Sequence, residues 1–363
     1  MEDSNGRSLS ARRTKAIVCA VALRILGGAT PCLGQTSGAA FLMIPSSPRA
    51  YSLGQSEAIS ALGAQAIGAN PANMGLSNHK QELFTSFATS IGGAQYGHLA
   101  AAFSTPNLGR VNSLGLAVTR LQIGGLQGAD ASGSYTGSSF GASDIAVAFA
   151  ASGKVTSDLR FGVTAKGIQS QISSYSSNWA LAGDAGLTYT FSQFAKPLSI
   201  GLSVINLGQG LKFAGQTDPL PTSINAGVAA PLGPVRAVFE INRWIYNEVT
   251  EVGLGMEYAL GPVAFRAGYL ARNSPQQNLA AKDQAGVAQV LGGLTFGLGV
   301  NAGPVQLDYA VAQQAADYGM TQRVGLTIKW GKAERQSDVA MKRTSARESS
   351  EWLIPGEYGI FVH

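Results

Sequence analysis

The sequence contains few charged residues, few histidines and only two cysteines. Charged residues make up 13% of its 363 residues, whereas ordinary globular domains have about 25%. The two cysteines, Cys19 and Cys32, both lie near the N-terminus, so the chain after residue 34 offers no thiol for a disulfide or a thiolate metal site. A mature chain without cysteine is typical of an exported protein, in which a stray thiol could form a wrong disulfide.

The sequence also lacks the patterns that catalysis and cofactor binding require. A hydrolase in a membrane would need a Ser nucleophile beside a His base, but no Ser-containing nucleophile motif accompanies His98, the only histidine on a predicted strand. No group of His, Cys and carboxylate residues has metal-ligand spacing, and no Gly-rich loop leads from a strand into a helix to hold phosphate. We predict a protein that is not an enzyme and binds no cofactor or metal, with His98 a structural or incidental residue.

The net charge of +5 depends mostly on the first 34 residues, without which it falls to +2. The basic pI therefore predicts no nucleic-acid partner. In this segment, basic residues precede an apolar stretch at 16–26 that is followed by small residues. This order is typical of a secretion signal, and the stretch is shorter than the roughly 20 apolar residues that a membrane-anchoring helix needs. We predict that residues 1–34 form a signal peptide cleaved near Gly34.

Beyond the N-terminus there is no long apolar run, so a helical membrane protein is not expected. The apolar residues occur instead in short segments where they alternate with polar or small residues, as Leu159 and Phe161 do with Arg160 and Gly162. Because strand side chains point alternately to two faces, each segment predicts a strand with one apolar face. The predicted strands are 82–91, 95–104, 111–121, 140–152, 158–171, 179–192, 198–207, 222–230, 235–243, 250–259, 263–271, 287–300, 305–313 and 321–330.

The connections between these strands are sorted by length. With the N-terminus in the periplasm, the outward connections are 92–94, 122–139, 172–178, 208–220, 244–249, 272–286 and 314–320, and five of these seven have seven residues or more. The inward connections are all short, and three of them contain the sequence Gly-Pro-Val. Short periplasmic turns and long outer loops are typical of outer-membrane barrels. We therefore predict an all-β membrane protein, a closed antiparallel transmembrane β-barrel of about 14 strands at 82–330, in contact with lipid of the bacterial outer membrane.

The charged residues of the predicted strands share the face that points away from lipid. A charge on the lipid face near mid-bilayer costs about 2–4 kcal/mol, which explains this placement without any function. The alternative is a polar lining that selects a ligand. The charged residues in question are Arg160, Lys166, Arg236, Glu240, Glu251, Glu257, Arg266, Asp308, Arg323 and Lys329. The residues predicted to line the lumen as candidates for such a site are Tyr96, His98, Arg160, Lys166, Glu251, Glu257, Arg266, Asp308 and Arg323.

The turn at Gly261 gives a specific register prediction. If this turn is tight, Tyr258 pairs with Val263 on the lipid face. Glu257 then lies diagonal to Arg266 inside the barrel, within reach of their long side chains.

Residues 35–81 are predicted to form an N-terminal loop and a helical plug. Between residues 51 and 74 the apolar residues recur at roughly helical spacing, and Pro71 ends the pattern. This predicts one or two short helices and a turn. Glycines on the inner face of the strands, Gly253, Gly255, Gly268 and Gly325, remove side-chain bulk. They either leave room for the plug or ease the curvature of the barrel. The tail at 331–363 is predicted to be largely disordered.

The plug region resembles the opening of the PorV/PorQ family of outer-membrane proteins. The similar residues are Arg49-Ala50-Tyr51-Ser52-Leu53-Gly54 and Asn70-Pro71-Ala72-Asn73-Met74-Gly75-Leu76, with shorter matches at Asn206-Leu207-Gly208, Gly253-Leu254-Gly255-Met256-Glu257-Tyr258 and Arg266-Ala267-Gly268-Tyr269. The resemblance implies a barrel like those of long-chain fatty acid transporters, closed by an N-terminal hatch, and some members work in type IX secretion. It marks Arg49, Gly54, Asn70, Pro71 and Gly75 as the plug motif.

Three functional hypotheses follow. The first, favoured by the resemblance, is a non-enzymatic partner of a protein secretion or surface-attachment machine, which binds secreted proteins or a translocon through the outer loops 122–139, 208–220 and 272–286. The second is a transporter of hydrophobic small molecules such as fatty acids, gated by the plug and by residues of the lumen. The third is a structural barrel without a transport role.

Overall fold

The computed structural model describes residues 37–77, 79–89, 93–129, 132, 134–194, 197–213, 215–273, 293–313 and 320–332. The predicted signal peptide at 1–34 lies outside these residues. The predicted tail at 331–363 also lies outside them, except for residues 331 and 332, which continue the last strand. Most of the predicted outer loop at 272–286 lies outside them as well.

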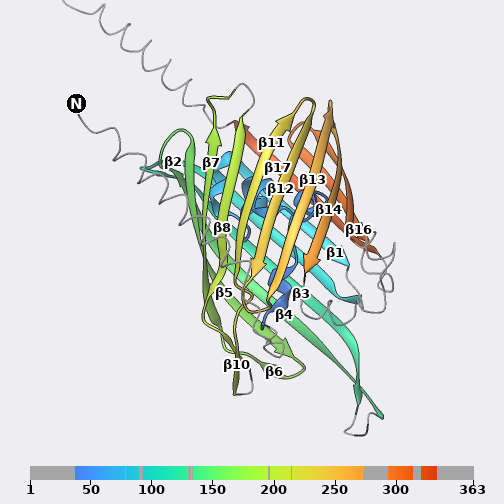
Figure 1. Ribbon diagram of the computed structural model, residues 1–363. Helices are drawn as coiled ribbons and strands as arrows, with labels where there is room; N and C mark the ends of the chain where they lie inside the picture. The colour runs from blue at the N-terminus through green and yellow to red at the C-terminus, as the bar shows by residue number, and fades with distance from the viewer. Residues whose placement is uncertain are drawn as a thin grey trace, which may run out of the picture. The chain divides into compact units, whose positions relative to one another are not determined.

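Fourteen antiparallel strands form a closed barrel (Figure 1). They are β1 (His79–Thr89), β2 (Gln95–Leu108), β3 (Val111–Ala129), β4 (Tyr135–Lys154), β5 (Leu159–Ile172), β7 (Ala180–Phe191), β8 (Leu198–Gly208), β11 (Ser223–Leu232), β12 (Val235–Trp244), β13 (Val249–Leu260), β14 (Val263–Asn273), β15 (Leu294–Ala302), β16 (Val305–Gln313) and β17 (Met320–Lys332). Strand β1 pairs with β17, and the pairing of β4 with β5 completes the ring. The predicted fold is confirmed.

The two faces of the barrel wall have opposite character. Outward side chains are apolar and accessible: Leu116, Leu187 and Leu254 are 45%, 46% and 50% exposed. The charged residues predicted to avoid lipid all alternate with such outward residues and lie on the inner face. A closed sheet leaves no unpaired edge in lipid, and an apolar exterior needs an apolar solvent. The protein is therefore a transmembrane barrel of the type found in the bacterial outer membrane.

The two ends of the barrel differ as predicted. At the end that we call the short-turn end, β11–β12, β13–β14 and β15–β16 are joined by two residues each. At the opposite long-loop end, the connection from β5 to β7 contains β6 (Tyr175–Ser176). The connection from β8 to β11 contains the hairpin of β9 (Leu211–Phe213) and β10 (Gln216–Asp218). In outer-membrane barrels the long loops face the cell exterior.

The register predicted at the Gly261 turn is wrong by two residues. Tyr258 pairs with Phe265, and Leu260 pairs with Val263. Gly261 adopts φ +58°, so a loop of only two residues closes the hairpin, as turns with glycine at the first central position do. The strands therefore reach further than the sequence pattern indicated.

The outer loop predicted at 122–139 is also wrong, because most of it is strand. Strands β3 and β4 continue past the apolar band as a long hairpin that projects at the bottom of Figure 1. The pair Leu126–Phe140 belongs to this extension, and register shifts lie on either side of Leu126. Its many Gly and Ser residues suggested a loop, but cross-strand pairing continues through them. The predicted strand 287–300 corresponds to β15, which begins at Leu294.

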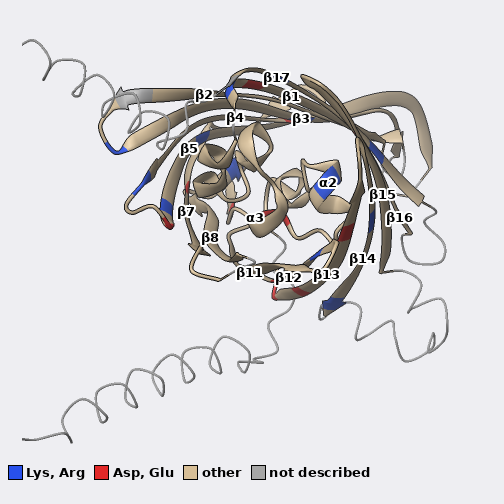
Figure 2. Ribbon diagram, turned by 90° about the horizontal axis from the view of Figure 1, so that it is seen from above, with Lys and Arg blue, Asp and Glu red and all other residues tan. Residues whose placement is uncertain are grey.

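The N-terminal segment lies inside the barrel as five single-turn elements (Figure 2). They are η1 (Ala40–Met43), α2 (Pro48–Tyr51), α3 (Glu57–Ser60), η2 (Gly63–Ala66) and η3 (Pro71–Leu76). We call residues 37–77 the plug. The predicted short helices are present, and Gly54, Gly63 and Gly68, which have positive φ, keep the helical elements short. No helix in the described part of the chain is long and apolar enough to cross a membrane.

Candidate functional site: the plugged lumen

Arg49 joins the plug to the wall through a chain of buried polar side chains. Its Nε and Nη2 atoms donate to the two carboxylate oxygens of Glu257 at 2.8 and 2.7 Å. Arg266 donates to the same Glu257 at 2.7 Å and, through its other nitrogen, to Asp308 at 2.7 Å. Gln306 donates to Asp308, and Lys329 donates to Gln306, each at 2.7 Å. We call these six residues the Arg49 network. The predicted proximity of Glu257 and Arg266 is confirmed, and the two pair directly rather than diagonally.

The Asn70–Pro71 turn fastens the other end of the plug. The Asn70 side-chain oxygen accepts from the backbone N–H of Ala72 at 3.2 Å, which caps η3. Its amide nitrogen donates to the Ala58 carbonyl at 2.9 Å. Thr188 of β7 donates to Asn73 at 2.7 Å. This turn therefore links two parts of the plug to each other and to the wall.

Gly75 and Arg160 meet at the end of η3. A Cβ atom on Gly75 would lie 2.9 Å from the Arg160 guanidinium nitrogen Nη1. Gly54 is equally constrained: it adopts φ +68°, and a Cβ there would lie 2.6 Å from the carbonyl oxygens of Leu254 and Tyr269. Both motif glycines are therefore positions where the plug backbone touches the wall.

Glycines on the inner face of the wall provide the matching space. An added Cβ would lie 2.3 Å from Gly54 at both Gly253 and Gly268, and 2.7 Å from Leu53 at Gly255. At Gly325 it would lie 2.8 Å from Pro48. Of the two explanations that the sequence left open, these contacts support room for the plug.

We expect Gly268→Ala to destabilise the seated plug by about 1–3 kcal/mol, the usual cost of overpacking. Trypsin cleavage can measure how readily the plug is released, because Arg49 is the only Lys or Arg in residues 37–77. Cleavage after Arg49, followed by mass spectrometry on the protein in detergent, should accelerate in the variant. Gly97→Ala is the matched control, since a Cβ on that strand glycine meets no heavy atom within 4 Å. Equal cleavage rates in the two variants would contradict the contact.

Two carboxylates that the sequence reading did not assign to the site also hold the plug. Glu240 of β12 accepts from the backbone N–H groups of Ala58 and Ile59, each at 3.2 Å. Glu57, in the plug itself, accepts from the N–H groups of Ser46 and Ser47 at 2.8 and 3.2 Å. Burial raises the pKa of the Glu57 carboxyl above its ordinary value, against the lowering effect of these hydrogen bonds. The inward parity of Glu240 was the only sequence signal for this role.

Lys166 and Arg323 face the lumen, and both are engaged with neighbouring groups. The Lys166 ammonium lies 2.9 Å from Asp184 and donates to Asn206 at 2.7 Å. Arg323 donates to the Pro45 carbonyl, and its guanidinium carbon lies 4.6 Å from the Tyr51 ring centre and 5.3 Å from that of Tyr96.

Glu251 lies toward the long-loop end and belongs to a separate cluster. Arg272 forms a salt bridge with it at 2.5 Å, and the Trp244 indole nitrogen donates to it at 3.0 Å. The Arg272 side chain is 45% exposed. The predicted lumen candidates are therefore divided between plug attachment, wall pairs and the rim. No group of three or more His, Cys, Asp or Glu side chains suited to a metal ion occurs among the described residues.

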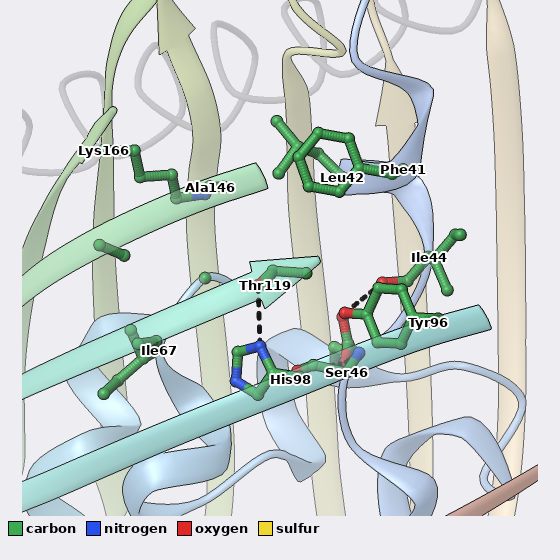
Figure 3. A pocket seen from close by; sticks show the side chains of 14 residues that line it. Phe41, Leu42, Ile44, Ser46, Ile67, Tyr96, His98, Thr119, Ala146 and Lys166 are labelled. Atoms are coloured by element: carbon green, nitrogen blue, oxygen red, sulfur yellow. Dashed lines mark hydrogen bonds between the residues drawn. The ribbon is translucent and has the colours of Figure 1, made fainter. Parts of the chain in front are cut away.

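Tyr96 and His98 line a cavity of ≈ 40 Å³ between the plug and strands β2–β5 (Figure 3). Its walls combine apolar side chains, including Phe41, Leu42 and Ile44 of the plug, with polar ones such as Glu57 and Lys166. It lies in the half of the lumen nearer the long-loop end, since β2 begins there at Gln95. A second cavity, of ≈ 320 Å³, lies at the short-turn end and is lined by much of the Arg49 network.

Two solved structures resemble this barrel. The CymD monoaromatic hydrocarbon channel is 12% identical, with a TM-score of 0.59, and the match covers 80% of this chain and 98% of that one. The Pseudomonas putida toluene transporter TodX is 13% identical, with a TM-score of 0.52, and the match covers 77% of this chain and 96% of that one. At such low identity the likeness establishes the fold alone. No protein-family model matches the sequence, and no curated relative was found.

These comparisons establish the fold of an outer-membrane barrel and give no support to the PorV/PorQ resemblance. The secretion hypothesis depended on that resemblance. It receives no support from the comparisons.

Proposed function

We propose that the protein carries small hydrophobic molecules across the outer membrane through its lumen, with the plug as the gate. The main support is an inward-facing apolar surface that leads from outside the membrane to the cavity beside the plug. The solved structures that share the fold are described as a monoaromatic hydrocarbon channel and a toluene transporter. Their substrates make an aromatic hydrocarbon the first molecule to test.

The apolar surface begins on the projecting β3–β4 hairpin, where the polarity of the two faces is reversed. On the outward face of β3, Leu116 and Val118 are followed by Arg120 and Gln122, so this strand leaves the apolar band near Arg120. Beyond that level, the apolar side chains lie on the opposite face, the one that lines the lumen where the strands cross the membrane. They are Ile123, Leu126, Phe140, Ala142 and Ile172, which we call the outer patch.

The outer patch is accessible and continuous with the cavity. Phe140 and Ile172 are 37% and 46% exposed. Ile123, Ala142 and Ile172 are in register across three strands. Nearer the membrane, Leu121 packs against a buried cluster that includes Phe41, next to the cavity. A hydrophobic molecule that leaves water gains about 25 cal/mol per Å² of buried apolar surface, which favours adsorption on this patch before entry.

Uptake by intact cells tests the proposal. A lipopolysaccharide leaflet is required, because a phospholipid bilayer is itself permeable to toluene. We expect cells that contain the protein to take up labelled toluene faster than cells that lack it. Entry of the polar β-lactam nitrocefin, measured by its hydrolysis in the periplasm, should be the same in both.

Two results would overturn the proposal. Equal toluene uptake in the two strains would exclude transport of this substrate class. A parallel rise in nitrocefin entry would indicate an open pore rather than a gated hydrophobic route. Loss of a surface protein from the strain that lacks the barrel, with toluene uptake unchanged, would favour the secretion hypothesis.

A further inference from the structure

His98, which lines the cavity between the plug and strands β2–β5, has a side-chain nitrogen without a hydrogen-bond partner among the described residues. Its Nδ1 lies 2.8 Å from the Thr119 hydroxyl, whereas its Nε2 is buried and has no hydrogen-bond partner in the described structure. The residue is 5% exposed and lines the cavity (Figure 3). Leaving such an atom unsatisfied costs about 1–3 kcal/mol. A group that occupies the cavity and pairs with Nε2 recovers this free energy.

The other polar groups around the cavity already have partners. Glu57 accepts from backbone N–H groups, Lys166 is held by Asp184 and Asn206, and the Tyr96 hydroxyl donates to the Ile44 carbonyl at 3.4 Å. Among the described residues that line this cavity, His98 alone has a buried side-chain nitrogen or oxygen without a partner. A ligand that pairs with His98 Nε2 would therefore displace no existing hydrogen bond.

We propose that this cavity is a head-group site, in which His98 Nε2 binds the hydroxyl group of a small hydrophobic alcohol or phenol. A neutral hydroxyl fits because it pairs with either imidazole tautomer: it accepts if Nε2 carries the proton and donates if Nε2 does not. An anionic head group fits less well, because Lys166, the cation that lines the cavity, is already paired with Asp184, and the Glu57 carboxyl also lines it. The inference rests on the proposed transport function and adds that, within its hydrophobic substrates, those that carry one hydroxyl bind this site more tightly.

The size of the cavity agrees with a head group rather than a whole ring. Its ≈ 40 Å³ compares with about 150 Å³ for a cavity that holds benzene. The apolar body of the ligand would extend past Leu42 and Ile44 toward the outer patch. Thr119 is a positioning residue here, because its hydroxyl holds the ring of His98 in place with either tautomer.

Phenol and toluene form a matched pair for the test, since a hydroxyl in one replaces a methyl in the other. The full chain, labelled with ¹⁵N in its imidazole rings, has only three histidines, so the His98 signal is assigned by its loss in His98→Phe. In mild detergent, phenol should shift the His98 Nε2 resonance in a saturable way, and toluene should not. Phenol should bind about tenfold more tightly than toluene, as one buried hydrogen bond allows.

Two variants keep the test decisive. His98→Phe retains a ring without hydrogen-bonding atoms and should abolish the preference for phenol. His98→Gln places an amide nitrogen near the former Nε2 and should keep much of it. Saturable shifts with both phenol and toluene would overturn the inference. The absence of a saturable shift with either ligand would also overturn it, and would indicate that Nε2 pairs with a water molecule. Failure of transport appears separately, as unchanged toluene uptake by cells while phenol still shifts the His98 signal.

Discussion

Glu257→Ala is expected to weaken the attachment of the plug to the barrel wall by about 3–5 kcal/mol, the cost of breaking a buried ion pair. Glu257 accepts from Arg49 of the plug and from Arg266 of the wall. Arg266 keeps Asp308 when Glu257 is lost, but Arg49 keeps only its bond to the Ser60 carbonyl. The side chains of Arg49 and Glu257 are 11% and 13% exposed, so the freed charge of Arg49 is poorly solvated in the seated plug.

Ion conductance across a planar bilayer measures this effect. A loss of about 3 kcal/mol reduces the ratio of seated to released plug by more than about 100-fold, so the variant should show frequent openings where the parent protein is closed. Arg272→Ala is the control, because it also breaks an arginine–glutamate pair, but at a side chain that is 45% exposed. Such a partly exposed pair contributes about 0–1 kcal/mol. Similar conductance in the two variants would show that the Arg49 network does not hold the plug.

A double variant tests whether the cost comes from the unpaired charge. Adding Arg49→Met to Glu257→Ala removes the uncompensated guanidinium and leaves an apolar chain of similar length. The double variant should therefore recover part of the lost plug attachment. Openings as frequent as in Glu257→Ala alone would assign the effect to changes in the wall rather than to the Arg49 charge.

Leu116→Arg is expected to make folding into a bilayer less favourable by about 2–4 kcal/mol, the cost of a cation on the lipid face near mid-bilayer. Leu116 lies between Leu114 and Val118 on the outward face of β3, and all three are accessible. Gln122→Arg is the matched control on the same strand and face, beyond the point where the face becomes polar. There the same substitution should cost about 0–1 kcal/mol.

Urea titration of folding into lipid vesicles measures both changes through tryptophan fluorescence. Equal destabilisation by the two arginines would mean that the lipid boundary does not lie between residues 118 and 122. The projecting β3–β4 hairpin would then be part of the membrane-spanning wall, and the outer patch would not face water.

The barrel could be predicted from the sequence because the pattern that specifies its strands is local. Each lipid-facing residue sits two positions from the next, and the energy of a misplaced charge is large, so segments such as 159–167 show the pattern directly. The space left by the inner glycines could also be predicted, because a small residue repeated on one face of a strand indicates that another segment packs there. Pairing of Glu257 with Arg266 followed from a turn at Gly261, although the size of that turn was misjudged.

The plug conformation could not be predicted, because its contacts are with residues far away in the sequence. Glu240 caps the backbone of Ala58 and Ile59 from a strand about 180 residues later. Gln65 donates to Thr327 across a still larger separation. Apolar plug residues such as Leu53 and Ile59 pack against the surrounding wall, so their spacing does not show where each short helix ends. The reversed faces of the β3–β4 hairpin could not be predicted either, because its many Gly and Ser residues suggested a loop rather than paired strands.

Native mass spectrometry of the protein, extracted from its own outer membrane in mild detergent, tests the account most directly. The account predicts a stoichiometric small hydrophobic molecule bound to the full chain, displaced when an excess of phenol is added. It also predicts no stoichiometric protein partner. A chain that carries secreted proteins or a large translocon component, and no small molecule, would contradict transport and return attention to the outer loops.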